Sequence, residues 1–337
     1  MPDSPADLHL VGLTTDGHLW HTMRQGANGH WLLFEDSTIA EAGKPGDFID
    51  VDCARQVANA DQLPSALHVV GVTADGRLWW ASRNSQTGSW NPFQNVEASG
   101  GGEQGTFVRA AVSVSHAWPE AGTPHGQPTV EIHIAGLTSD GHLLVTSRTP
   151  TAATFTRFTN VELTGGWEQG DLRAAGLAGI TGRNNATSSH LCAIGGDGRL
   201  LHSIGRPGSG LGAWAPLRDV EIAGQAGERG DLVDVGCAAD LHVGAVSGDG
   251  RVWYTFRDPS RPERWRTFTD LESARNVGTF TRMSAAQIRS ELHFSGVTSN
   301  GQLWHLIRKD PPSPFGDVER GPGHAGESGT FQAVGIA

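Results

Sequence analysis

Short apolar runs alternate with polar, glycine-rich turns along the whole chain. The clearest example is residues 67–83 (LHVVGVTADGRLWWASR), where two apolar segments flank Asp75-Gly76. An Asp-Gly pair between such segments is a strong hairpin signal and predicts a type I′ turn, with positive φ at both central residues. No stretch of useful length shows the 3.6-residue period of an amphipathic helix, so the pattern predicts an all-β chain.

The same hairpin recurs, giving six copies in all. Each copy carries a histidine near its start, and the separations between these histidines are 59, 65, 57, 52 and 51 residues: His9, His68, His133, His190, His242 and His293. A unit of this size cannot bury both of its faces alone, so its repetition indicates an array of packed units.

Each repeat holds two further predicted strands. One precedes the hairpin and opens with Gly-Asp or Gly-Thr, and one follows it and carries an aromatic residue such as Trp90 or Trp265. Four strands in about 50 residues are typical of a propeller blade, with strands A to D counted outward from the axis. The chain opens in a strand B and ends in a lone strand A at residues 329–337. We expect this last strand to complete blade 1, which removes an exposed sheet edge.

The sequence therefore predicts one domain, residues 1–337, folded as a single six-bladed β-propeller with four antiparallel strands per blade and a ring closed by the C-terminal strand. The predicted blades are residues 8–37 with 329–337, 46–97, 105–162, 170–221, 230–272 and 278–319.

Composition narrows the classes of partner. The net charge of −11 and the pI of about 5.7 argue against nucleic-acid binding, which needs a basic face. No apolar run approaches the ~20 residues that span a membrane, and residues 1–10 show no signal-peptide pattern, so we expect a cytoplasmic protein or one released without a signal peptide. The three cysteines, Cys53, Cys192 and Cys237, lie in apolar strands without a CxxC motif and are expected to be buried thiols.

The repeat LHVVGVTADGRLWWASR…GSWNPFQNV resembles that of the tectonin-like and fucose-lectin-like bacterial propellers, and more loosely that of the fungal six-bladed fucose lectins. The resemblance covers nearly the whole chain and implies sugar pockets between adjacent blades. The fungal lectins hold fucose with an Arg on strand B, a Glu on strand C and an aromatic wall. Here the strand B position is His in every copy. The strand C position nearest the Glu is His21, Trp80, Val145, His202, Tyr254 or His305, so the resemblance does not extend to the fucose-binding set.

The six strand B histidines allow three interpretations. Equivalent residues on neighbouring blades should lie roughly 10 Å apart, given ~4.8 Å between strands, so they cannot share one metal ion. We therefore expect no metal site and no cofactor. Two interpretations stay open: each His ties its blade to the next through a backbone carbonyl, or it lines a ligand pocket.

Other recurring side chains have structural explanations. Strand C starts with Leu-Trp in four blades, as at Trp79, which fits a core position. It ends in an arginine, as at Arg83 and Arg257, which we expect to stack on the strand D indole beside it. Glutamates in the loops between strands D and A are expected to be solvated rather than Ca²⁺ ligands: Glu103, Glu168, Glu228 and Glu327.

The leading hypothesis is a lectin-like binding module with glycan or other small-molecule pockets between blades. Aromatic faces would stack on sugar rings and imidazoles would bond their hydroxyls, first beside blades 2 and 5. The candidate ligand-binding residues are His68, Trp80, Trp90, His242, Tyr254, Trp265, His9, His21, His293 and His305.

Two alternatives belong to other classes. No GxSxG, HExxH or phosphate-binding glycine motif is present, so we name no catalytic residue and favour a protein that is not an enzyme. A cyclase or isomerase in the central funnel would need one blade-specific acid–base pair. A scaffold for protein partners would use the long A–B loops. Trp118, His125 and Trp167 break the repeat symmetry and mark places where such a function could be grafted.

Overall fold

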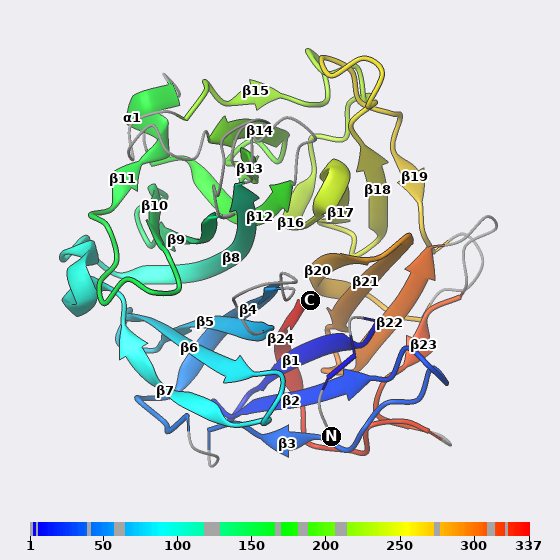
Figure 1. Ribbon diagram of the computed structural model, residues 1–337. Helices are drawn as coiled ribbons and strands as arrows, with labels where there is room; N and C mark the ends of the chain where they lie inside the picture. The colour runs from blue at the N-terminus through cyan, green and yellow to red at the C-terminus, as the bar shows by residue number, and fades with distance from the viewer. Residues whose placement is uncertain are drawn as a thin grey trace, which may run out of the picture.

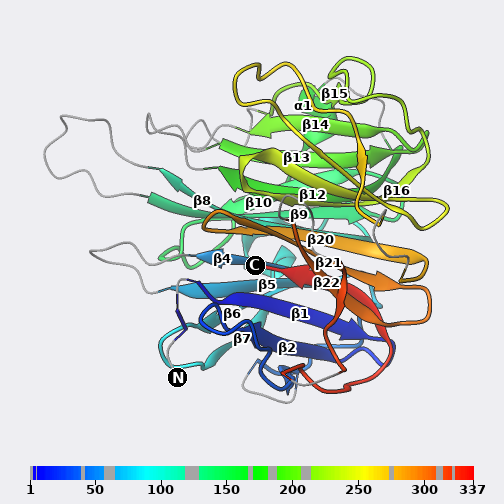
Figure 2. The same ribbon diagram turned by 90° about the vertical axis from the view of Figure 1, so that its right-hand side faces the viewer.

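Six four-stranded antiparallel sheets surround a central axis in the computed structural model (Figure 1). In the view turned by 90°, the strands run along that axis (Figure 2). The six-bladed propeller expected from the repeats is confirmed. The structure describes residues 3–4, 6–38, 42–56, 65–117, 129–165, 170–180, 188–205, 214–272, 277–308, 314–320 and 323–337.

The blades follow one another in chain order, and their strands lie within the ranges given above. Blade 1 holds β1 (Leu8–Thr14), β2 (Leu19–Arg24), β3 (Glu35–Asp36) and β24 (Phe331–Ile336). Blade 2 holds β4 (Phe48–Gln56), β5 (Ala66–Thr73), β6 (Leu78–Asn84) and β7 (Trp90–Asn95). Blade 3 holds β8 (Phe107–Ala117), β9 (Thr129–Thr138), β10 (Leu143–Arg148) and β11 (Thr159–Asn160).

The second half of the ring repeats this order. Blade 4 holds β12 (Leu172–Ile180), β13 (Ser188–Gly195), β14 (Leu200–Gly205) and β15 (Arg218–Asp219). Blade 5 holds β16 (Leu232–Ala238), β17 (His242–Ser247), β18 (Val252–Phe256) and β19 (Thr269–Asp270). Blade 6 holds β20 (Phe280–Ile288), β21 (Glu291–Thr298), β22 (Leu303–Arg308) and β23 (Gly316–Asp317). The described residues form three short helical turns between strands: η1 (Glu97–Gly101), α1 (Val161–Gly165) and η2 (Ala239–Leu241).

The C-terminal strand closes the ring. β24 pairs antiparallel with β1, with Leu10 opposite Ile336, and the sheet order is β24-β1-β2-β3. The pairing continues one residue beyond the end of β24, where the His9 N–H donates to the Ala337 carbonyl at 2.7 Å. Blade 1 therefore takes its innermost strand from the other end of the chain, as the sequence predicted.

The predicted type I′ hairpin turn is wrong. Gly76 has φ of 76°, but Asp75 is not in the positive-φ region. The Gly76 N–H donates to the Thr73 carbonyl at 2.8 Å and the Thr73 N–H to the Arg77 carbonyl at 3.0 Å, which makes a three-residue loop with glycine in the left-handed position. The Thr73 hydroxyl donates to Asp75 Oδ1 at 2.5 Å and so stabilises this alternative loop.

The core lies between neighbouring blades. A strand A phenylalanine fits against a strand B glycine within each blade: a Cβ on Gly71 would lie 2.7 Å from the Phe48 ring, so only glycine fits there. The strand D tryptophans reach the preceding blade. Trp90 of blade 2 packs in one cluster with Val11 and Leu13 of blade 1.

A buried glutamate after strand D holds the following loop. Glu221, 2 % exposed, accepts the N–H groups of Leu200 and Gly230, both at 3.0 Å. Equivalent buried glutamates are Glu97, Glu162 and Glu319. This Asn/Asp-Val-Glu element was not recognised in the sequence. Of the four glutamates that were singled out, Glu103, Glu228 and Glu327 are exposed, and Glu168 lies outside the described residues.

All three cysteines are free and buried, as expected. In the described part of the chain, no helix has the length and apolarity needed to cross a membrane.

Candidate ligand-binding site between blades

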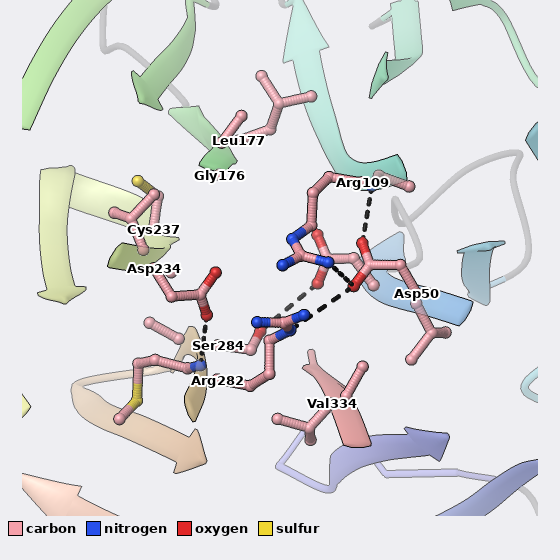
Figure 3. Close-up of a pocket in the computed structure, with 18 of the residues that line it drawn as sticks. Asp50, Arg109, Gly176, Leu177, Asp234, Cys237, Arg282, Ser284 and Val334 are labelled. Carbon is pink, nitrogen blue, oxygen red and sulfur yellow. Dashed lines mark hydrogen bonds and ion pairs between the residues drawn. The ribbon is translucent and has the colours of Figure 1, made fainter. Parts of the chain in front are cut away.

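One end of the central channel is closed by charged side chains of the strands β4, β8, β16 and β20 (Figure 3). Asp50 Oδ1 lies 3.9 Å from Arg109 Nη1 and 4.0 Å from Arg282 Nε. Asp50 also accepts the Ala110 N–H, and Asp234 accepts the Met283 N–H, each at 2.8 Å. The remaining cavity of about 50 Å³ has space for only a few water molecules.

Burial dominates the electrostatics of this cluster. It raises the pKa of Asp50 and Asp234, and the guanidinium groups of Arg109 and Arg282 partly offset that increase. Burial also raises the pKa of Asp52 to about 7. Hydrogen bonds from the Val112 N–H and the Ser284 hydroxyl act in the opposite direction and lower this pKa, but burial has the larger effect.

The other end of the channel is a funnel of about 170 Å³. Its described lining includes Arg55, Gln287 and Arg289 among mostly small apolar residues, and no histidine, aspartate or glutamate side chain. The acid–base pair that the enzyme hypothesis requires is therefore not among the described residues of the funnel. Trp118, His125 and Trp167 lie outside the described part of the chain. Across the described residues, no group of three His, Cys, Asp or Glu side chains is arranged to hold a metal ion.

The strand B histidines face the gaps between blades. In three blades the partner is a second histidine twelve residues later on strand C. His9 Nδ1 lies 3.0 Å from His21 Nε2, and the same contact measures 2.9 Å for His190 and His202 and 3.0 Å for His293 and His305. His9 is directly opposite Met23, so His21 is its diagonal neighbour on the same face of the sheet.

The other three histidines also have partners in their own blade. His242 Nδ1 contacts the Tyr254 hydroxyl at 2.6 Å, His68 Nε2 contacts Gln56 Oε1 at 3.2 Å, and His133 Nε2 contacts Ser115 Oγ at 3.0 Å. The described hydrogen bonds of these histidines all stay within one blade, and none of them is the expected tie to a backbone carbonyl of the next blade. Burial lowers the pKa of His21, His68 and His190 to about 3, so these imidazoles are neutral.

The next blade completes each gap with its strand D aromatic residue. Trp90 meets His21 edge to face at 5.7 Å, Trp265 meets His202 at 5.3 Å, and Trp31 meets His305 at 5.3 Å. Trp90 and His68, both candidates for a site beside blade 2, therefore lie in different gaps, and so do Trp265 and His242, the candidates beside blade 5. Both indoles point toward the preceding blade, where they join its core.

Large strand C rings are covered by an arginine from the next blade. The Arg148 guanidinium lies 4.5 Å from the centre of the Trp80 ring, and that of Arg308 lies 4.2 Å from Tyr254. Stacking thus occurs across the gap, whereas the expected partner was the strand D aromatic residue of the same blade. Arg148 also lies 5.1 Å from that residue of its own blade, Phe155. The stacking leaves Trp80 5 % and Tyr254 2 % exposed. Ligand binding beside His68, Trp80, His242 and Tyr254 stays a prediction.

Between blades 4 and 5 the same gap is open. It holds a cavity of about 290 Å³, whose lining includes His202, Trp265, Arg257, Arg218 and Glu263. Here Arg257 Nε donates to the Pro262 carbonyl of its own blade. Burial, His190, Arg257 and Arg218 all lower the pKa of His202 well below its usual value. The cavity therefore combines a neutral imidazole, two guanidinium groups, an exposed carboxylate and part of an indole.

Of the residues at this site, only Trp265 was among the ligand-binding candidates predicted from the sequence. His202 is the counterpart of His21 and His305, and Arg257 belongs to the recurring strand C arginines, so their pattern was available. Arg218 and Glu263 have no counterpart in the repeat and gave no signal.

No family model and no curated protein matches the chain. Solved structures do. SapL1 lectin, in complex with alpha methyl fucoside, has a TM-score of 0.57 at 9 % identity and covers 94 % of this chain and 93 % of its own. AofleA from Arthrobotrys oligospora has a TM-score of 0.60 at 10 % identity, covering 95 % and 85 %. Aleuria aurantia lectin, a six-bladed β-propeller with a novel fucose recognition mode, has a TM-score of 0.54 at 9 % identity. The match covers 93 % of this chain and 92 % of that lectin. At these identities the likeness shows the fold alone.

Proposed function

We propose that this protein is a carbohydrate-binding, lectin-like propeller whose working site is the cavity between blades 4 and 5. The observation that carries the proposal is that open cavity, of about 290 Å³, bounded by His202, Arg257 and Trp265. Its volume is close to the lower limit of about 300 Å³ for small-molecule pockets, which suits a single sugar ring.

The side chains supply what a sugar needs. The indole of Trp265 gives an apolar wall for the C–H face of a pyranose, and the guanidinium groups of Arg218 and Arg257 offer several N–H donors to ring hydroxyls. Glu263 adds an acceptor at the rim. This mixture of one apolar wall and a few directional polar groups is typical of ligand pockets.

The structural neighbours support the class of ligand. SapL1 and Aleuria aurantia lectin are described with fucosides, and their propellers match the whole ring of this one. The particular sugar does not transfer, because the strand B arginine of the fungal lectins is a histidine here. The arginine of this site comes instead from the end of strand C in the following blade.

A glycan array tests the proposal with a variant that fills the cavity. Ala223 is exposed and lines it, so Ala223→Trp should weaken glycan binding at least tenfold while the fold is kept. Ala98→Trp changes an exposed alanine in the corresponding loop of blade 2 and serves as the control, with binding unchanged. Wild-type protein that binds no glycan, or binding that survives Ala223→Trp, would contradict the proposal.

A further inference from the structure

The gap between blades 1 and 2 contains a carboxylate from the chain itself. Asp3 Oδ2 lies 2.8 Å from Arg83 Nη1 and 3.4 Å from His9 Nε2. The Asp3 side chain is 0 % exposed. The segment is held in place by Arg55, which donates to the carbonyls of Ser4 and Asp7, each at 2.7 Å. The side-chain carboxylate of Asp3 thus occupies this gap in the way that a bound ligand would.

The gap between blades 4 and 5 is built from the same parts. The stacked histidine rings lie 5.3 Å apart for His9 and His21 and 5.2 Å for His190 and His202. A strand D tryptophan of the next blade meets the outer histidine edge to face in both gaps. Arg257 pairs with Trp265 of its own blade as Arg83 pairs with Trp90, so it is the counterpart of the residue that binds Asp3.

Carboxylates approach the strand B histidine in other gaps as well. Glu131 Oε2 lies 3.6 Å from His133 Nε2, and Glu291 Oε2 lies 3.8 Å from His293 Nε2. Glu291 also interacts electrostatically with Arg24, the arginine that blade 1 contributes to the same gap. A carboxylate near the strand B histidine therefore recurs in this ring, and in two of these gaps an arginine of the next blade interacts with it as well.

The arginines of the open gap lack such a carboxylate in the described part of the chain. Neither Arg257 nor Arg218 forms an ion pair there, although both line the cavity. Glu263 is exposed and interacts with Arg257 only from beyond ion-pair distance. Asp219, the other acidic residue of the lining, is already paired with Arg199 at 3.0 Å. Two guanidinium groups thus face a cavity without a direct counterion.

We propose that the cavity between blades 4 and 5 binds the carboxylate of an acidic sugar, a uronic or sialic acid, through Arg257 and Arg218. Arg257 then pairs with the ligand as Arg83 pairs with Asp3. Planar guanidinium groups match carboxylates in geometry, and their charge-assisted hydrogen bonds are stronger than those to hydroxyls. This inference rests on the proposed carbohydrate binding and specifies its substrate class.

The test compares acids with their neutral forms. Methyl glucuronide and N-acetylneuraminic acid, and the methyl ester of each, are titrated into the protein by calorimetry. We expect at least one acid to bind at least tenfold more tightly than its ester, and Arg257→Gln to remove that difference. Arg218→Gln, at an exposed position, should reduce the difference without affecting folding.

Arg308→Gln is the matched control. It changes the equivalent arginine of blade 6, which lies on Tyr254, and should leave binding of the acid unchanged. Equal affinity for acid and ester, with binding still lost in Ala223→Trp, would overturn the acidic-sugar inference and leave the lectin function standing. If the protein binds no glycan on the array, and neither the acids nor their esters in solution, both the acidic-sugar inference and the lectin function are overturned.

Discussion

Asp3 and Arg83 form an ion pair of 2.8 Å inside the gap between blades 1 and 2, with the aspartate side chain fully buried. Asp3 precedes the first repeat, and Arg83 is the second-last residue of β6, strand C of blade 2. One copy of a repeated site is therefore occupied by a residue that the repeat does not contain. Its occupation distinguishes two sites that the repeat alone would make equivalent.

Removing this carboxylate should open the gap. Asp3→Ala leaves Arg83 without its partner and should cost about 1–3 kcal/mol, limited by the ability of the short segment to detach. The number of acidic-sugar sites measured by calorimetry should rise from one to two. Ser4→Ala, beside it on an exposed serine, should change neither quantity. An unchanged stoichiometry would show that Asp3 does not block this site.

The His242–Tyr254 contact of 2.6 Å should contribute measurably to stability. Tyr254→Phe removes only the hydroxyl and leaves His242 Nδ1 without this bond, so we expect a loss of about 1–3 kcal/mol. His242→Ala should cost a similar amount, and the double variant should lose less than the sum of the two. Chemical denaturation of all four proteins measures the coupling. Strictly additive losses would mean that the hydrogen bond contributes nothing.

The repeats made the fold predictable, because each blade restates the same strand and turn pattern. The pairing of β24 with β1 followed from counting strands. The type I′ turn predicted at Asp75-Gly76 was wrong because the Thr73 hydroxyl donates a hydrogen bond to the Asp75 side chain. The preference of an Asp-Gly pair for this turn takes no account of such a contact. The loop type was decided by a side chain outside the dipeptide.

The site was less predictable than the fold. A repeat shows which residues recur, but not whether a strand D side chain points to its own blade or to the preceding one. Trp265 was therefore assigned to the wrong gap, although its involvement in a site was expected. Asp3, Arg218 and Glu263 lie outside the recurring pattern, and only the three-dimensional arrangement brings them to their gaps.

Buried histidines should make the protein sensitive to acid. The pKa of His21, His68 and His190 is lowered to about 3 in the folded state, first by burial, against about 6.5 in an unfolded chain. The unfolded chain therefore takes up protons below pH 6.5 that the folded protein does not, and stability falls as the pH drops from 6.5 toward 3. The melting temperature should decrease steadily from pH 7 to pH 4. In His68→Gln the free energy of unfolding should depend less steeply on pH over that range. A wild-type protein equally stable at both ends of the range would contradict this.

Asp52 should have the opposite pH dependence. Burial raises its pKa to about 7 in the folded state, while an unfolded chain has about 3.9. Its contribution to stability is complete below pH 3.9 and is lost as the pH rises through about 7. Asp52→Asn removes the ionisation, so the variant should gain stability relative to wild type between pH 5 and pH 8. Urea denaturation at both values measures the gain. If the variant and the wild type differ in free energy of unfolding by the same amount at pH 5 and at pH 8, Asp52 does not titrate between these two pH values.

Closure of the ring by β24 should be essential to the fold. Deleting residues 329–337 removes the inner strand of blade 1 and exposes the edge of β1 together with the core around Phe331 and Ile336. An open sheet edge invites association between molecules, so we expect an insoluble or molten product. A soluble truncated protein that melts like the full chain would refute closure.

A single substitution tests the same closure in a protein that can still fold. Gly335 of β24 lies against β4 of blade 2, and a Cβ there would lie 2.5 Å from the Cys53 nitrogen and 2.7 Å from the Asp52 Cα. Both are backbone atoms, so relief requires the two blades to move apart. Gly335→Ala should therefore lower stability by about 1–3 kcal/mol, the usual cost of overpacking. Gln332→Ala, on the same strand and half-buried, is the control and should cost less. Equal melting temperatures for Gly335→Ala and wild type would mean that β24 does not pack against blade 2 in solution.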